Sequence, residues 1–373
     1  MKKLLLLQTA FIGDVILATP LAQAAHEIFA PCEVHFMVIP GAANLLEQNP
    51  HIQRVWVYDK RGKQRGLRGL WQLSRQLRAE RFDLALVPHR SLRSALLVWL
   101  ARIPVRVGFH RSAGAFLFNQ KIAYEEKHEV ERNLDLLRGF APQFFVQHVA
   151  QASFPAGKMP ALQQRDLALV ASSFKPAIHW NENDEARVAL LTKESAATRD
   201  WIALAPGSVW ATKRWPKEKF AALTRKLSAE TGAVIFLLGG KEDAALCEQI
   251  KDESGANCIN TAGLLSLRES AALLNRCAVL VSNDSAPTHL GVSTNCRVIA
   301  IFGPTVPRFG FAPFGEGHQI IERDLPCRPC SAHGSHTCPI GTHACMQEIE
   351  VEKVFQSVVA MLPKQSEYEA RRH

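Results

Sequence analysis

The chain has 373 residues, of which 47% are hydrophobic and 21% charged. Such a length usually divides into two domains, and such a composition excludes a disordered or fibrous protein. The net charge of +9 is concentrated between Arg54 and Arg111, where fourteen Lys and Arg stand against three Asp and Glu, so the remainder is slightly acidic. We therefore expect an anionic partner to dock on the N-terminal region.

The chain contains no run of about 18 apolar residues, so we predict no membrane-spanning segment. The opening MKKLLLL has the lysines and the apolar run of a signal peptide, but Gln8, Thr9, Gly13 and Asp14 interrupt that run. We therefore expect the protein to remain in the cytoplasm.

Short apolar runs alternate with helical patterns in the first part of the chain. We expect strands at 3–8, 33–40, 54–59, 82–89 and 105–109, and helices at 15–29, 67–77 and 92–102. The pattern fades over 141–165, which reads as a linker. Alternation between strands and helices predicts a parallel sheet with helices on both faces.

The same alternation resumes after the linker. Strands are expected at 201–208, 233–240, 277–284 and 296–304, with helices beginning near Pro216 and Glu242. The predicted fold class is therefore α/β, with two Rossmann-like domains whose parallel sheets face each other across a cleft. We place these domains at 1–165 and 166–347, and the final helix at 348–362 could pack back on the first of them.

Four strand ends in the second domain carry small and polar residues: Pro206–Ser208, Gly239–Asp243, Asn283–Ser285 and Gly303–Thr305. Because carboxyl ends of parallel strands meet at one sheet edge, backbone amides and helix N-termini there could bind phosphate. Ordinary turns with capping side chains explain any one of these loops better than a ligand site does. Four such loops at one edge favour a phosphate site.

The usual nucleotide motifs are absent from the sequence. There is no G-x-G-x-x-G, no P-loop and no D-x-D pair to hold a sugar-nucleotide metal. A bound diphosphate would need neutralisation by Lys213, Arg214 and backbone amides. In the first domain, Asp14 follows the first strand, where it could cap a helix or act chemically.

Four motifs in order, FIGDVILATP, APGSVWATKRWP, SNDSAPTHLG and IFGPT, resemble the ADP-heptose:lipopolysaccharide heptosyltransferases of glycosyltransferase family nine. The spacing is most similar to the heptosyltransferase II branch. The resemblance implies a GT-B fold with the acceptor on the N-terminal domain and ADP-heptose on the C-terminal one. It also implies an inverting, metal-independent transfer to the lipopolysaccharide inner core at the cytoplasmic face of the inner membrane, with no cofactor.

Site residues follow from the resemblance by position. Asp14 matches the general base and Lys213 the lysine that contacts the donor. The remaining donor-binding candidates are Ser208, Thr212, Glu242 or Asp243 for the ribose, Asp284 for the heptose, and the diphosphate turn with Ser285, Ala286, Thr288 and His289. After the aspartate the heptosyltransferase I branch often has Thr-Gly, whereas this chain has Ser285-Ala286-Pro287, and Pro287 removes one amide from that turn.

Candidate acceptor contacts lie in the basic first domain. Gly13 would let the chain pass close to a substrate, and His89, Arg90, Arg93 and Arg111 could touch the acceptor, a lipid A carrying Kdo or heptose. Arg68, Arg75 and Arg78 could face lipid head groups of an anionic membrane. Taken singly, each arginine is better explained as a solvated surface residue. We expect no nucleic-acid partner, and the sequence leaves the oligomeric state open.

A cysteine cluster lies near the end of the second domain: Cys327, Cys330, Cys338 and Cys345, spaced C-x2-C-x7-C-x6-C. Four thiolates could bind zinc, but the spacing lacks the long middle of paired zinc knuckles, so free thiols or a disulfide remain alternatives. The other five cysteines lie mostly in apolar runs and are expected in the core.

Two other classes of function stay open from the residues. One is a GT-B enzyme of different chemistry, such as a nucleotide-sugar epimerase or a transferase of another sugar. The other is a non-catalytic protein that binds a membrane surface. The combination of Asp14, Lys213 and Asp284 argues against a mere binder.

Overall fold

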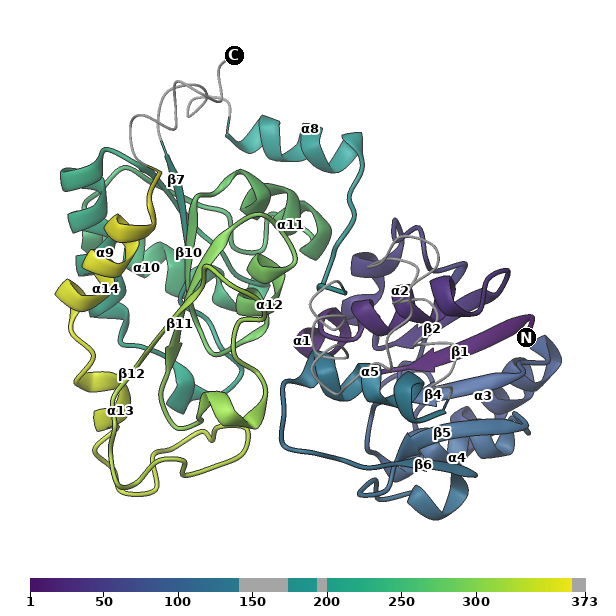
Figure 1. Cartoon of the computed structure of the whole chain (residues 1–373). Helices are drawn as coiled ribbons and strands as arrows, with labels where there is room; N and C mark the ends of the chain where they lie inside the picture. Colours follow the sequence, from purple (N-terminus) through teal and green to yellow (C-terminus); the bar gives the residue numbers. More distant parts are fainter. Residues whose placement is uncertain (141–173, 193–199, 364–373) are drawn as a thin grey trace, which may run out of the picture. The chain divides into compact units, whose positions relative to one another are not determined.

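The computed structural model describes residues 1–140, 174–192 and 200–363 and divides into two compact units, Met1–His179 and Trp180–His373 (Figure 1). The expected linker at 141–165 and the expected boundary between 165 and 166 lie outside the described residues. Within those ranges no helix has the length and apolar character needed to cross a bilayer.

The first unit is built on a six-stranded parallel sheet of order β3-β2-β1-β4-β5-β6. Its strands are β1 (Lys3–Leu7), β2 (Glu33–Val38), β3 (Arg54–Val57), β4 (Leu84–Val87), β5 (Val105–Phe109) and β6 (Gln120–Ile122). Its helices are α1 (Ile12–Ile16), α2 (Thr19–Ile28), η1 (Pro40–Leu46), α3 (Gly66–Glu80), α4 (Leu92–Leu100), η2 (Ala115–Leu117) and α5 (Glu129–Phe140).

Helices cover both faces of this sheet. Leu5 and Leu7 of β1 share a buried cluster with apolar side chains of α3 and α4. Because successive side chains of a strand point to opposite faces, Leu4 and Leu6, also fully buried, serve the other face. There α2 and α5 pack against each other and against β2 and β5.

The second unit repeats this plan with the order β12-β11-β10-β7-β8-β9. Its strands are β7 (Trp201–Ala205), β8 (Val234–Leu237), β9 (Cys258–Asn260), β10 (Val279–Asn283), β11 (Arg297–Phe302) and β12 (Gln319–Glu322). Its helices are α8 (Glu182–Leu191), η3 (Ala211–Lys213), α9 (Lys217–Thr231), η4 (Lys241–Asp243), α10 (Ala244–Ser254), α11 (Leu267–Arg276), α12 (Ala286–Val292), η5 (Pro307–Phe309), α13 (Ala344–Gln347) and α14 (Val351–Met361).

The expected fold class is confirmed for each unit, since both are parallel sheets covered by helices. Both follow the doubly wound order, in which the strand order reverses between the first and fourth strands. In this chain that point lies between β1 and β4 in the first unit and between β7 and β10 in the second. Ligands of such sheets bind at the carboxyl ends of these strands.

The expectation that the final helix packs back on the first domain is wrong. Helix α14 packs against α9, β10 and β11 of the second unit. Its apolar side chains Val354, Phe355 and Val358 belong to that unit's core, together with α9 and α10. The second unit itself therefore covers the apolar face of α14 (Figure 1).

Candidate functional site

The first candidate site lies where β1 and β4 end. Asp14 is the third residue of α1, and its carboxylate accepts a hydrogen bond from the Phe11 amide at 3.2 Å, so Asp14 does cap this short helix. Burial, helped by the nearby Glu129 carboxylate, raises the pKa of Asp14 to about 7, although the Phe11 amide and Arg90 act in the opposite direction. Capping and proton exchange near neutral pH are therefore compatible in one residue.

Glycine at position 13 is not required by backbone conformation. Gly13 is buried inside α1 and is not among the glycines with positive φ. The expectation that Gly13, which has no side chain, lets the chain pass close to a substrate does not depend on its φ and stays a prediction. The buried Asn133 of α5 holds the end of this segment by donating to the Leu17 carbonyl at 3.1 Å.

His89, at the end of β4, is fixed beside the β1 loop. Its Nδ1 lies 2.9 Å from both the Thr9 and the Ser94 hydroxyls. Burial first, then the positive charges of Lys60 and Arg90, lower the pKa of His89 to about 4. The imidazole is therefore neutral at physiological pH and can exchange hydrogen bonds with a hydroxyl.

The structure brings Lys60 and Glu129 to this edge, although the sequence did not single them out. The Lys60 ammonium donates to the Thr9 carbonyl at 2.5 Å. Glu129 is buried on α5 and pairs with Arg132 at 2.6 Å. No sequence motif indicates either residue, because each reaches the edge from an element that is remote in sequence from the β1 loop.

The three predicted arginines differ in what they contact. Arg93 donates to the Tyr58 hydroxyl and to the carbonyls of Gln64 and Gly66, so its donors tie α4 to the loop before α3. Arg90 lies over the Tyr124 ring, 4.3 Å from its centre. Arg111 is exposed. Arg90 and Arg111 are thus the better placed of the three to meet an anion.

The second candidate site lies where β7 and β10 end. The Lys213 ammonium, at the end of η3, contacts the Asp284 carboxylate at 2.6 Å, and both side chains are largely buried, 12% and 6% exposed. The same carboxylate oxygen accepts from the Thr305 hydroxyl at 2.6 Å. The pair is therefore a desolvated cation and anion held by a third group, a costly arrangement that needs all its hydrogen bonds.

A second layer of polar contacts holds this pair in place. Asn283 is fully buried, and its side chain donates to the Pro206 carbonyl at 2.8 Å and accepts from the Trp215 amide at 3.0 Å. These bonds lock the end of β10 to the segments on both sides of η3. The sequence indicated Asp284 as a site residue, but no pattern in it predicted that Asn283 would fix the backbone beside it.

The loop after β11 is fixed by a residue of the cysteine-rich segment. The Arg328 guanidinium donates to the carbonyls of Gly303 and Thr305 and to the Glu322 carboxylate. Thr305 thereby keeps its hydroxyl against Asp284. Thr305 belongs to the Gly303–Thr305 loop that the sequence predicted at this edge, whereas Arg328 was not predicted as a site residue, since only the fold brings it beside that loop.

The cysteine-rich segment also contacts η3 directly. The Thr212 hydroxyl donates to the Ser335 carbonyl at 2.8 Å, and its carbonyl lies 2.7 Å from His343 Nε2. Gly334 has φ +96°, and a side chain there would meet Trp210 at 2.8 Å and Lys213 at 3.2 Å. The segment thus packs on the turn that presents Lys213.

The structure does not assemble the four cysteines of this segment as a zinc site. Across the described ranges, no group of three or more His, Cys, Asp or Glu side chains is arranged to hold a metal ion. The cysteines are free thiols, and Cys345 is buried. The five remaining cysteines are buried, as expected.

The remaining predicted donor residues line the same edge. Asp243 lies against Gly207 and accepts from the Gly240 amide at 3.0 Å, whereas Glu242 is exposed. Ser208 uses its carbonyl to accept from Arg214. Ser285 and Ala286 begin α12, where Pro287 has no N–H and the Thr288 amide bonds Ser285. His289 is buried.

The chain has the same fold as solved glycosyltransferases that are built from two Rossmann-like domains. The structure superposes on E. coli ADP-heptose lipopolysaccharide heptosyltransferase II with a TM-score of 0.72 and 22% identity, covering 97% of this chain and 98% of that one. It superposes on a glycosyltransferase family 9 protein from Veillonella parvula with a TM-score of 0.75 and 21% identity, covering 96% and 97% of the two chains. These likenesses confirm the GT-B fold class.

The family follows from the sequence comparisons. The model of glycosyltransferase family 9 (heptosyltransferase) matches residues 70–340, and the chain therefore belongs to this family and is a glycosyltransferase. The chain is 26% identical to lipooligosaccharide heptosyltransferase 2 of Haemophilus ducreyi over 317 residues, which is 82% of this chain and 85% of that protein. It is 23% identical to lipopolysaccharide heptosyltransferase 2 of E. coli over 311 residues, 82% and 84% of the two. The resemblance inferred from the four motifs is thus confirmed.

The raised pKa of Asp14 predicts a pH-dependent stability. Between about pH 4, where the unfolded carboxyl titrates, and about pH 7, the folded state binds the extra proton, so its stability falls as pH rises. Asp14→Asn should therefore raise the free energy of unfolding above pH 7 and leave it nearly unchanged near pH 4. Urea unfolding of the variant and the parent at both pH values measures this difference.

Asp59→Asn is the matched control. Hydrogen bonds from the Lys63 and Gly62 amides lower the pKa of Asp59, so its substitution should reduce stability above pH 4, the opposite sign. An Asp14→Asn effect of the same sign as Asp59→Asn would contradict the raised pKa.

The buried Lys213–Asp284 pair predicts a large cost of breaking it. Lys213→Met leaves the Asp284 carboxylate buried with the Thr305 hydroxyl, and should reduce the free energy of unfolding by about 3 kcal/mol. Lys217→Met, which breaks the exposed pair with Glu253, should change stability little. Chemical denaturation measures the free energy of unfolding of both variants. Equal losses would contradict the large cost predicted for breaking the buried Lys213–Asp284 pair.

Proposed function

We propose that this chain transfers L-glycero-D-manno-heptose from ADP-heptose to the inner core of lipopolysaccharide, with inversion at the anomeric carbon. Family membership supports the heptosyl transfer, and the printed names of the relatives support the lipopolysaccharide acceptor. The structural observation that carries the proposal is a carboxyl group at the carboxyl edge of the first sheet with a pKa of about 7. A general base works best when its pKa lies near the working pH.

In the proposed reaction, Asp14 accepts the proton of an acceptor hydroxyl while that oxygen attacks the anomeric carbon of the heptose. The bond from this carbon to the diphosphate breaks, and ADP leaves with the electron pair. A single displacement of this kind inverts the anomeric configuration. Neutral His89 and exposed Arg90 and Arg111 are proposed to orient the acceptor on the first unit, which we assign to acceptor binding.

The second unit is proposed to hold ADP-heptose. Lys213 supplies positive charge to the leaving diphosphate, as preorganised charge does in other transferases. With Pro287 lacking an amide and the Thr288 amide bonded to Ser285, the turn contributes the amides of Ser285 and Ala286. Ser208 and Thr212 shape the phosphate pocket, His289 supports the turn, and Asp284 contacts the heptose.

We assign the ribose to Glu242 rather than to Asp243. The Asp243 carboxylate is already bonded to the Gly240 amide and lies against Gly207, whereas Glu242 is exposed. The proposed reaction needs neither a cofactor nor a divalent ion, so EDTA should leave its rate unchanged. We place it at the cytoplasmic face of the inner membrane, where the acceptor, a lipid A carrying Kdo or heptose, is anchored.

Asp14→Asn tests the general base. The variant keeps an oxygen that can accept from the Phe11 amide, so it should fold and bind ADP-heptose with unchanged affinity. Its turnover should fall by about 100-fold or more, the usual contribution of general acid–base catalysis. Calorimetric titration with ADP-heptose measures the affinity for the donor. Mass spectrometry of the acceptor measures the turnover.

The turnover of the parent should rise with pH through about 7, as the Asp14 carboxyl loses its proton. Ser208→Ala, on the donor side, is the control and should weaken donor binding without moving this pH profile. An Asp14→Asn enzyme that keeps most of its turnover would remove Asp14 from the base role.

A further inference from the structure

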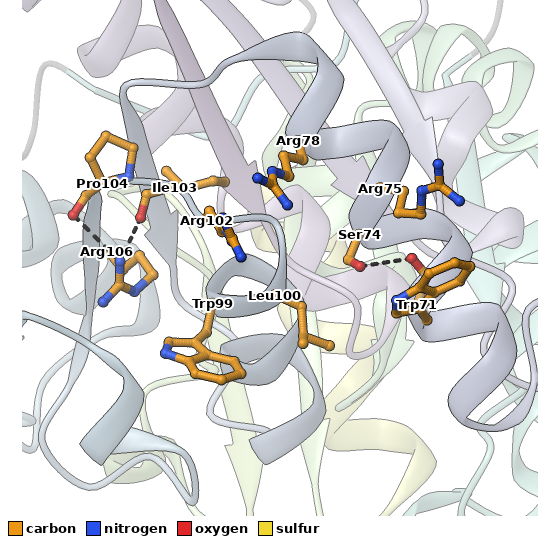
Figure 2. A pocket seen from close by; sticks show the side chains of 10 residues that line it. All are labelled: Trp71, Ser74, Arg75, Arg78, Trp99, Leu100, Arg102, Ile103, Pro104 and Arg106. Atoms are coloured by element: carbon orange, nitrogen blue, oxygen red, sulfur yellow. Dashed lines mark hydrogen bonds between the residues drawn. The ribbon is translucent and has the colours of Figure 1, made fainter.

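The first unit carries a pocket of about 530 Å³ apart from the Asp14 site, between α3, α4 and the segment leading into β5 (Figure 2). Its lining is dominated by arginines and indole rings. The residues are Trp71, Ser74, Arg75, Arg78, Trp99, Leu100, Arg102, Ile103, Pro104 and Arg106. No step of the proposed reaction uses this pocket.

The positive charge of this pocket is not balanced by neighbouring acids. No Asp or Glu occurs from Leu84 through Tyr124, and Glu80, the one acid of α3, is paired with Lys3 and Arg54. Within the described part of the chain, Arg75, Arg78 and Arg102 form no ion pair with a carboxylate. Guanidinium groups without acidic partners favour a phosphate, which they can bind through two parallel hydrogen bonds.

Arg106 differs from the other three arginines. Its guanidinium donates to the carbonyls of Ile103 at 2.6 Å and Leu117 at 2.9 Å, which fixes the wall of the pocket. Burial lowers the pKa of Arg106. The guanidinium groups that remain available to a ligand are therefore those of Arg75 and Arg78 on α3 and that of Arg102.

The rim of the pocket exposes large apolar side chains. Trp71 is 53% exposed on α3 and Trp99 is 47% exposed on α4, and the Arg75 guanidinium lies 4.9 Å from the Trp71 ring. Leu67, one turn before Trp71, is 79% exposed. Figure 2 shows both indoles at the edge of the pocket, with the arginines beside them. Exposed indoles next to cationic side chains are typical of surfaces that lie in the interface of a bilayer.

We propose that this α3–α4 face docks on a bilayer of anionic phospholipid, with a headgroup phosphate in the pocket between Arg78 and Arg102 and the two indoles among the acyl-chain carbonyls. The exposed indoles and Leu67 favour a lipid over a soluble phosphate, which would gain nothing from them. The inference rests on the proposed function in one respect, namely that the lipid-anchored acceptor of that function lies in such a bilayer. The pocket itself belongs wholly to the first unit.

Vesicle binding tests the proposal with the full chain. The protein should bind vesicles of phosphatidylglycerol and phosphatidylcholine, bind pure phosphatidylcholine poorly, and dissociate as salt is raised. Arg78→Gln with Arg102→Gln should weaken binding to the anionic vesicles roughly 30-fold, because each arginine near the surface contributes to the attraction. Lys175→Gln with Lys353→Gln removes two exposed charges elsewhere and should bind like the parent.

A second readout reports the indoles directly. Vesicles with brominated acyl chains should quench the tryptophan fluorescence of the parent, and Trp71→Phe with Trp99→Phe should lose most of that quenching while keeping its thermal unfolding unchanged. Equal vesicle binding by the Arg78/Arg102 variant and the Lys175/Lys353 control would overturn the proposal. So would quenching that persists without the two indoles.

The assay contains neither ADP-heptose nor acceptor, so its failure leaves the proposed transfer untouched. In turn, the Arg78/Arg102 variant should transfer heptose to a detergent-solubilised acceptor at the parent's rate. Loss of that transfer together with loss of vesicle binding would assign the pocket to the acceptor and contradict the docking proposal.

Discussion

The parallel pairing of β1 with β4, and of β7 with β10, is the constraint on which the functional edges of both units depend. At each pairing the strand order reverses, so the loops after the two strands leave in opposite directions and open a space between them. In the first unit this space is bordered by Asp14 and His89, and in the second by Ser208 and Asp284. A change of register at either pairing would separate these residues.

The two sheet edges differ in how well their charged side chains are stabilised. In the second unit, Lys213, Asp284 and Thr305 satisfy one another, and Asn283 and Arg328 hold the backbone around them. In the first unit, burial and the nearby Glu129 carboxylate outweigh the hydrogen bond from the Phe11 amide, so the charged form of the Asp14 carboxyl is disfavoured. A satisfied ion pair gives a rigid cationic site, and a poorly stabilised carboxylate gives a base that can take up a proton.

The sequence predicted the parts of the fold that long apolar runs specify. The strands that contain Leu4–Leu7, Leu84–Val87 and Val279–Asn283 were all expected. The site roles of Asp14, Lys213 and Asp284, which lie within recognisable motifs, stay predictions. The edge strands β6, β9 and β12 were missed because they have three or four residues and little apolar character. The final helix was assigned to the wrong unit, because an amphipathic pattern shows that a face is buried and not what buries it.

Residues that act through tertiary contacts could not be found in the same way. Lys60, Glu129 and Arg328 each reach a site from a segment remote in sequence from the motif they support. The arginines of the α3–α4 pocket were recognised as basic, but their grouping with Trp71 and Trp99 depends on α3 packing beside α4. Charge composition is thus readable along the chain, and the assembly of a binding surface is not.

The coupling of heptose transfer to ADP release tests the central claim most directly. Purified protein is incubated with ADP-heptose and a lipopolysaccharide precursor that lacks the next inner-core heptose, and both products are quantified by mass spectrometry. The account predicts one ADP released for each heptose added to the acceptor, with negligible release when the acceptor is omitted. Equal ADP release without acceptor, or an unmodified acceptor in the presence of ADP release, would contradict it.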